Sequence, residues 1–278
     1  MATKTKIVLD PGHGKYGNPA KVNGQWIVKG FYEGTNNYEA VQLLKAELEK
    51  YENVEIVVTR DNIDADPKLI DRGAMGRDAD LFYSWHSNGV DNKNAYGVSS
   101  FSSVRRNGRT ICDNISKAVI EVFKEFGSKN TYYRGYSQRA DEDYPTVDYY
   151  GVLRSATLKN PDAAPYGAKP IDTQCKNAII IEHGFHSNPA ECEVLNNPVA
   201  LKKIAEAEAK VIAKYLDLKE KDPEPTPTPP DPAPDGYYYF AVLSANKNKK
   251  YAEEDVANAK KLGYKDAYVK YAKRDGAL

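Results

Sequence analysis

Two of the chain's four histidines stand where short apolar runs end. His13 follows the run Ile-Val-Leu at residues 7–9, after Asp, Pro and Gly, and His86 closes the run Leu-Phe-Tyr-Ser-Trp at residues 81–85. Glu182 closes a third run, Ala-Ile-Ile-Ile. Such runs are typical of β-strands, and in an open α/β sheet ligands and active sites gather at the carboxyl ends of the strands. We therefore expect these three side chains to face one crevice.

Glu33 is a fourth candidate, because it follows a glycine-containing loop and precedes a segment with helical periodicity. Two imidazoles and one carboxylate with an open fourth position form the ligand set of catalytic zinc, and a further carboxylate that is not a ligand can act as the base. Each residue alone has a simpler interpretation. A histidine at a strand end is commonly a hydrogen-bonded structural residue, and an acid at a helix N-terminus is favoured by the helix dipole. The spacing alone leaves both interpretations open.

The elements that would position these residues alternate along most of the chain. Short apolar runs predict strands at 6–9, 54–59, 81–85, 98–101 and 178–181. Apolar residues at three- and four-residue intervals predict helices within 41–51, 111–126 and 201–215. This alternation predicts an α/β fold with a mostly parallel central sheet and helices on both faces. Residues 128–153 are polar, hold six tyrosines and lack clear periodicity, so we expect a long functional loop there.

Short motifs follow one another in a fixed order: Leu-Asp-Pro-Gly-His-Gly at 9–14, Glu33 with Asn37, Thr-Arg-Asp at 59–61, residues 69–72, Ala-Asp-Leu-Phe at 79–82, Ser-Trp-His-Ser-Asn at 84–88, and Ile-Glu-His-Gly-Phe-His-Ser-Asn-Pro at 181–189 with Glu191. In this order they resemble the motifs of the zinc-dependent N-acetylmuramoyl-L-alanine amidases, the type 3 family. The resemblance covers nearly all of residues 5–216. That family hydrolyses the amide that joins the lactyl group of N-acetylmuramic acid to L-alanine of the peptidoglycan stem peptide.

The resemblance implies a role for individual residues. His13, Glu33 and His86 would bind Zn²⁺, and Glu182 would be the catalytic glutamate, which takes a proton from water and passes it to the leaving nitrogen. Arg154 matches a basic position of the family. It would contact a substrate carboxylate or the oxyanion, or else form a salt bridge at a strand edge.

Asn88, which ends the second histidine motif, is a further candidate for substrate binding. The chain departs from the family pattern at Lys15, Gly34 and Gly89. These departures affect loop shape and substrate choice, and they leave the four proposed chemical groups intact. Two other histidines occupy positions that vary in the family and are left outside the predicted metal site: His183 and His186.

Composition excludes several other classes of protein. Lys+Arg and Asp+Glu are 39 each, so the formal net charge is zero, which argues against a globally basic nucleic-acid binder and a highly charged disordered chain. The longest aliphatic run is far shorter than the roughly 18 residues of a membrane span. The first apolar run is too short for a signal-peptide core of about 7 to 15 residues, so we expect synthesis in the cytoplasm without a signal peptide. Three cysteines make no disulfide framework, and we expect reduced, buried thiols.

A proline-rich stretch divides the chain, since seven of the twelve residues from 223 to 234 are proline. Proline lacks a backbone donor and fixes φ, so this stretch should be an extended spacer. We expect a catalytic zinc amidase domain at 1–218, a linker at 219–236 and a small β-α-β module at 237–278.

The C-terminal module resembles half of a sporulation-related, SPOR-type repeat, which implies binding to the cell wall. It carries nine basic and five acidic residues, a net charge of +4, and seven tyrosines. This composition suits an anionic wall polymer and stacking on sugars, although the tyrosines could also fill a thin core. Because so short a unit has a small core, we also expect that it could form a dimer.

Three functions remain open from the sequence. The leading one is a peptidoglycan amidase that acts on the bacterial cell wall after release from the cytoplasm, as a phage endolysin, with a cellular autolysin or a sporulation amidase as the alternative. A non-catalytic wall-binding protein would keep the same fold, but the presence of all four chemical groups favours an enzyme. A zinc peptidase that cuts within the stem peptide would keep the same metal site.

Overall fold

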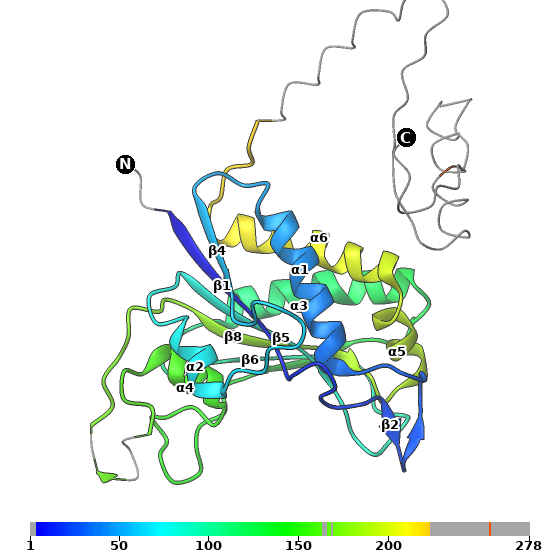
Figure 1. Cartoon of the computed structure of the whole chain (residues 1–278), viewed down its shortest axis with the longest axis horizontal. Helices are drawn as coiled ribbons and strands as arrows, with labels where there is room; N and C mark the ends of the chain where they lie inside the picture. Colours follow the sequence, from blue (N-terminus) through cyan, green and yellow to red (C-terminus); the bar gives the residue numbers. More distant parts are fainter. Residues whose placement is uncertain (1–3, 163–165, 168, 223–255, 257–278) are drawn as a thin grey trace, which may run out of the picture. The chain divides into compact units, whose positions relative to one another are not determined.

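The computed structural model describes residues 4–162, 166–167, 169–222 and 256 (Figure 1). The chain divides into two units, Met1–Asp222 and Pro223–Leu278. The proline-rich part of the predicted linker and the predicted module at 237–278 lie outside the described residues, Val256 excepted.

The first unit ends later than the boundary expected at residue 218. Glu52 N donates to the carbonyl oxygen of Lys219 at 2.7 Å, and Lys221 N donates to that of Lys50 at 2.9 Å. The four residues that follow 218 therefore belong with the α/β unit.

A six-stranded sheet forms the centre of this unit, with the order β4-β1-β5-β8-β6-β7. β1, β4, β5 and β8 run parallel, whereas β6 is antiparallel to β8 and parallel to β7. The prediction of a mostly parallel sheet is confirmed. The strands are β1 (Thr5–Pro11), β4 (Val54–Val58), β5 (Leu81–Asn88), β6 (Val98–Ser102), β7 (Tyr133–Ser137) and β8 (Ala178–Phe185), and a separate hairpin joins β2 (Lys21–Val22) and β3 (Gln25–Trp26).

Helices cover both faces of the sheet, as predicted (Figure 1). The long helices α1 (Glu33–Leu48), α3 (Arg109–Glu125) and α6 (Pro198–Tyr215) pack on one face, and the short helices α2 (Leu69–Ala74) and α4 (Gly151–Thr157) lie on the other. The short helix α5 (Pro189–Leu195) follows β8. None of the helices described is long and apolar enough to cross a membrane.

Successive residues of a strand point to opposite faces, and this alternation places the chemical groups. In β8, Ile181 packs in the core with α1, α3 and α6, whereas Ile180 packs in the core with α4. Glu182 therefore falls on the α4 side and His183 on the α6 side. The same alternation in β5 puts His86 on the side of Glu182, and the two are paired in the ladder between the strands.

Part of the segment expected to be a long loop is regular. Residues 133–137 form β7 at the edge of the sheet, and α4 begins at Gly151. Polar contacts hold this edge strand: the Tyr133 hydroxyl lies 2.7 Å from Ser100 Oγ. The loop expectation holds for the residues between these two elements.

All three cysteines are free and buried, as expected for reduced thiols. Burial raises the pKa of each thiol to about 12, so these cysteines stay protonated and unreactive near neutral pH. The residues are Cys112, Cys175 and Cys192.

Candidate active site

His13 reaches the site through a tight turn at the end of β1. Its φ of 59° is left-handed, and Gly12 precedes it. A Cβ on Gly12 would lie 2.1 Å from Cε1 of His86, so only glycine allows the turn to approach this imidazole. The ring centroids of the two histidines are 5.0 Å apart and the planes are nearly perpendicular, at 77°. The ends of β1 and β5 therefore bring both imidazoles together.

Glu33, the first residue of α1, completes the cluster and is buried. Its Oε2 lies 3.3 Å from Nε2 of His13, and its Oε1 lies 3.1 Å from Nδ1 of His86. Ser87 N donates to Oε1 at 3.0 Å and Asn37 Nδ2 donates to the same oxygen at 3.3 Å. These donors fix the orientation of the carboxylate, as partners of metal ligands commonly do.

The structure accounts for the glycine at position 34, one of the positions where the chain departs from the family pattern. A Cβ at this position would lie 1.7 Å from the carbonyl oxygen of Gly14, so the start of α1 is pressed against the turn that carries His13. A larger residue at Gly34 would push this helix away from the turn. The close approach helps to bring Glu33 within reach of both histidines.

The three residues predicted as metal ligands fit a zinc ion. One donor atom from each of His13, Glu33 and His86 lies within 4.8 Å of the others. Two imidazoles and one carboxylate are the donor set of several catalytic zinc sites. The His13 side chain is 41% exposed, which leaves the cluster open to solvent on one side. The prediction that these residues meet is confirmed by the geometry.

Charges inside the cluster shift the pKa values of its members. Burial disfavours the Glu33 carboxylate, but the hydrogen bond and charge of His86 and the charges of His13 and His186 lower its pKa to about 2. Burial likewise disfavours the charged form of His86, but the hydrogen bond to Glu33 and nearby carboxylates raise its pKa above the ordinary value. Burial lowers the pKa of His13. Glu33 is therefore ready as an anionic ligand, and His13 as a neutral one.

Glu182 lies next to this cluster, beside its ladder partner His86. Burial raises the pKa of Glu182 to about 7, with the charge of His86 opposing the shift and that of Glu33 adding to it. A carboxyl group with such a pKa can both accept and donate a proton near neutral pH. The structure thus brings together all four chemical groups that the sequence singled out.

His186 was left outside the metal site, and it does not join the cluster of donors. It lies behind Glu33 instead: its Nδ1 is 3.9 Å from Glu33 Oε2 and 2.9 Å from Ser87 Oγ. Its contact with Glu33 was not predicted, although its place directly after β8 could have suggested it. Asn18 is a second residue whose contact with Glu33 was not predicted, and it donates from Nδ2 to Glu33 Oε2. Nothing in the sequence of its loop points to this contact.

The two predicted substrate contacts lie at different distances from this chemistry. Asn88 ends β5 two residues after His86, and its carbonyl oxygen accepts from His186 N at 2.9 Å. Arg154 lies on α4, where its Nη1 is 3.6 Å from Asp141 Oδ2. Arg154 thus forms an ion pair, as the salt-bridge alternative expected, but on a helix and not at a strand edge. Substrate contacts by either residue stay predictions.

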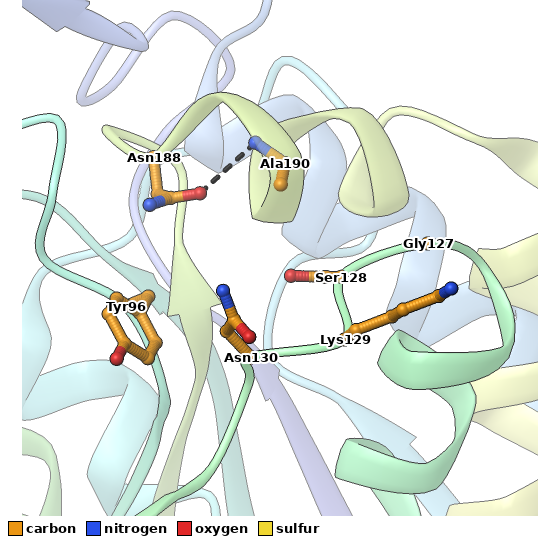
Figure 2. Close-up of a pocket in the computed structure, with 7 residues that line it drawn as sticks. All are labelled: Tyr96, Gly127, Ser128, Lys129, Asn130, Asn188 and Ala190. Atoms are coloured by element: carbon orange, nitrogen blue, oxygen red, sulfur yellow. Dashed lines mark hydrogen bonds between the residues drawn. The ribbon is translucent and has the colours of Figure 1, made fainter.

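A cavity of about 330 Å³ opens on the same edge of the sheet, between the start of α5 and the turn after α3 (Figure 2). Asn188 Oδ1 accepts from Ala190 N at 3.0 Å at its rim. None of the four chemical groups lines it. The lining residues are Tyr96, Gly127, Ser128, Lys129, Asn130, Asn188 and Ala190.

An α/β sheet with two histidines and a glutamate converging at its carboxyl edge is typical of a metal-dependent hydrolase. The chain belongs to the N-acetylmuramoyl-L-alanine amidase family, whose model matches residues 7–214. A comparison with curated proteins gave no match.

Solved structures, two amidases among them, have the same fold. An N-acetylmuramoyl-L-alanine amidase from Clostridium difficile 630 is 21% identical with a TM-score of 0.56, and the match covers 78% of this chain and 98% of that one. The amidase AmiC2 of Nostoc punctiforme is 23% identical with a TM-score of 0.55, covering 78% and 99% of the two chains. Cwp6 from Clostridium difficile is 23% identical with a TM-score of 0.56; the match covers 77% of this chain but 30% of Cwp6. At these identities the likeness shows the fold.

Proposed function

We propose that the chain is a zinc-dependent amidase that cleaves the bond between N-acetylmuramic acid and L-alanine of the peptidoglycan stem peptide. The observation that carries the proposal is the convergence of His13, Glu33 and His86, with Glu182 beside them, at an open edge of the sheet. Membership of the amidase family supports the choice of substrate class.

The chain's own residues supply the proton chemistry. His13, Glu33 and His86 would hold the zinc ion, which when bound acts as a Lewis acid and lowers the pKa of water. Glu182, with a pKa of about 7, accepts the proton of the attacking water and returns it to the alanine nitrogen. This second transfer is essential, because an amide nitrogen leaves poorly unless it is protonated.

As the biological role, the proposal is lysis of a bacterial host by a phage endolysin, with a cellular autolysin or a sporulation amidase as the alternative. The sequence of the C-terminal module, with its net charge of +4 and seven tyrosines, supports attachment to the wall in each case. Expression in a bacterial host with and without a pore-forming membrane protein tests the first role. An endolysin of this kind should lyse the culture only when pores are present.

The experiment that tests the activity is digestion of purified cell wall. An amidase releases stem peptides with a new N-terminal alanine and leaves muramic acid unsubstituted. A peptidase acting within the stem would expose a different amine, and a wall-binding protein would release none. The matched control is Glu182→Gln, which keeps the shape of the side chain and should lower turnover by about two to four orders of magnitude.

A further inference from the structure

His183 lies on the opposite side of β8 from Glu182 and is fully buried. Its imidazole stacks on Trp85 of β5, with ring centroids 3.7 Å apart and planes within 12°. Both rings lie in the layer between the sheet and α6. A fully buried histidine needs partners for its two ring nitrogens, and this one has them on different elements.

The first partner is Glu208 of α6, whose Oε1 lies 2.7 Å from Nε2 of His183. Glu208 also accepts a hydrogen bond from the hydroxyl of Tyr83, and one from Nε1 of Trp85 at 3.2 Å. All four side chains are fully buried. A buried carboxyl group is tolerated only when hydrogen bonds satisfy it, and here the Tyr83 hydroxyl and the Trp85 indole donate to Glu208 while His183 Nε2 shares a third hydrogen bond with it.

The second partner is the backbone of a predicted metal ligand. Nδ1 of His183 lies 2.9 Å from the carbonyl oxygen of His86, and because a carbonyl oxygen only accepts, Nδ1 is the donor. The ladder between β5 and β8 shifts register directly after the pair of His86 with Glu182. The side chain of His183 therefore holds the backbone of His86 at the point where regular strand pairing is interrupted.

We propose that the pair of His183 and Glu208 positions His86 relative to Glu182, and so sets both the affinity of the site for zinc and the rate of proton transfer. The pair links α6 to the backbone of His86, and it does so one residue away from the proposed base. His183 is a positioning residue in this account, since it acts through His86. The inference rests on the proposed function and states which residues hold the backbone of a predicted zinc ligand in place.

Three substitutions separate positioning from simple stabilisation of the core. His183→Leu removes the hydrogen bonds to Glu208 and to the His86 carbonyl. His183→Asn keeps an amide donor close to the place of Nδ1, within reach of the His86 carbonyl, but cannot reach Glu208. Ile212→Ala, on the same helix as Glu208 and fully buried, weakens the core without removing a hydrogen bond of the polar network.

The first readout is the dissociation constant of the metal alone, measured by competition with a chelator at a temperature where every variant is folded. We expect His183→Leu to weaken zinc binding about 10- to 100-fold, the range seen when partners of metal ligands are removed. His183→Asn should recover part of this loss. Ile212→Ala should lower the melting temperature and leave zinc affinity unchanged.

The second readout is the division between kcat and KM on a soluble muramyl peptide. His183→Leu should lower kcat with little change in KM, because the substrate is not contacted. If His183→Leu fails to fold, Glu208→Gln tests the same link with almost no change in shape, and it should also weaken zinc binding.

The inference would be overturned if His183→Leu and Glu208→Gln lowered the melting temperature but bound zinc as tightly as the unaltered chain. The network would then only stabilise the core. Failure of the proposed function has a different signature. In that case the unaltered chain itself would bind no zinc or release no N-terminal alanine from cell wall.

Discussion

Gly12→Ala should disable the metal site while leaving the fold intact. The added Cβ would lie 2.1 Å from Cε1 of His86, whereas ordinary contact begins at 3.4 Å, so the imidazole would have to retreat by about 1.3 Å. Metal-ligand distances tolerate about 0.2 Å, and a displacement of about 1 Å can cost on the order of a hundredfold in rate. We expect a loss of at least about 100-fold in turnover, together with weaker zinc binding.

The matched control is Gly151→Ala, because a Cβ on Gly151 would find its nearest neighbour, a methyl group of Leu69, at an ordinary 3.4 Å. This variant should keep turnover and zinc affinity, and it should stabilise α4 slightly, since alanine favours helix. Turnover and chelator competition are measured on both variants, with circular dichroism to verify folding. A folded Gly12→Ala protein with unchanged zinc affinity would refute the steric reasoning.

Three further predictions concern pH, buried charge and the C-terminal module. Zinc binding requires neutral imidazoles, and since the pKa of His86 is raised, zinc affinity should fall about tenfold per pH unit below that pKa. Chelator competition across a pH series measures this dependence, and a zinc affinity that does not change with pH would contradict it. Arg72→Met should cost about 3–5 kcal/mol in denaturant unfolding, because it strands the buried Asp10 carboxylate, whose Oδ1 lies 2.7 Å from Arg72 Nε. Burial opposes ionisation of Asp10, but Arg72 and two hydroxyls hold its pKa below the ordinary value. The ionised Asp10 therefore stabilises the fold above its ordinary pKa, and this stabilisation is lost as the pH falls through the lower pKa of the folded protein. The difference in unfolding free energy between the unaltered chain and Arg72→Met should shrink in acid, and equal stability of the two at neutral pH would contradict the argument. A chain ending at Asp222 should cleave soluble muramyl peptides at the full-length rate but bind intact cell wall more weakly. Binding of the full-length chain to the wall should weaken with salt if the net charge of +4 of the C-terminal module dominates. Equal wall retention by the full-length and the shortened chain at every salt concentration would assign the module another role.

The parallel strands and the site at their ends could be predicted because both carry a local signal. A strand buried on both faces is a continuous apolar run, as in β1 and β8, and a histidine or acidic residue at the end of such a run, or a few residues after it, stands out. His13, His86 and Glu182 were visible in this way. Glu33 carries no such local signal, since its contacts depend on how closely α1 approaches the turn after β1.

The elements and contacts that escaped prediction depend on tertiary structure. β7 has no apolar run, because it is an edge strand held by tyrosine hydroxyls such as that of Tyr136, 2.8 Å from Ser102 Oγ. α4 has seven residues, too few to show a helical period. Alternation along β8 places His183 on the buried side, but its partner Glu208 lies on a helix 25 residues away, and no local pattern joins them.

Zinc dependence is tested by measuring zinc content and wall-amide cleavage on the same samples: the chain as purified, after removal of metal by a chelator, and after zinc is restored. We expect one zinc ion per chain, held by His13, Glu33 and His86, with cleavage lost on removal and regained on restoration. We also expect Glu182→Gln to carry the same zinc content but to be essentially inactive. Full release of N-terminal alanine by the metal-free chain, or near-normal turnover by zinc-loaded Glu182→Gln, would contradict these expectations.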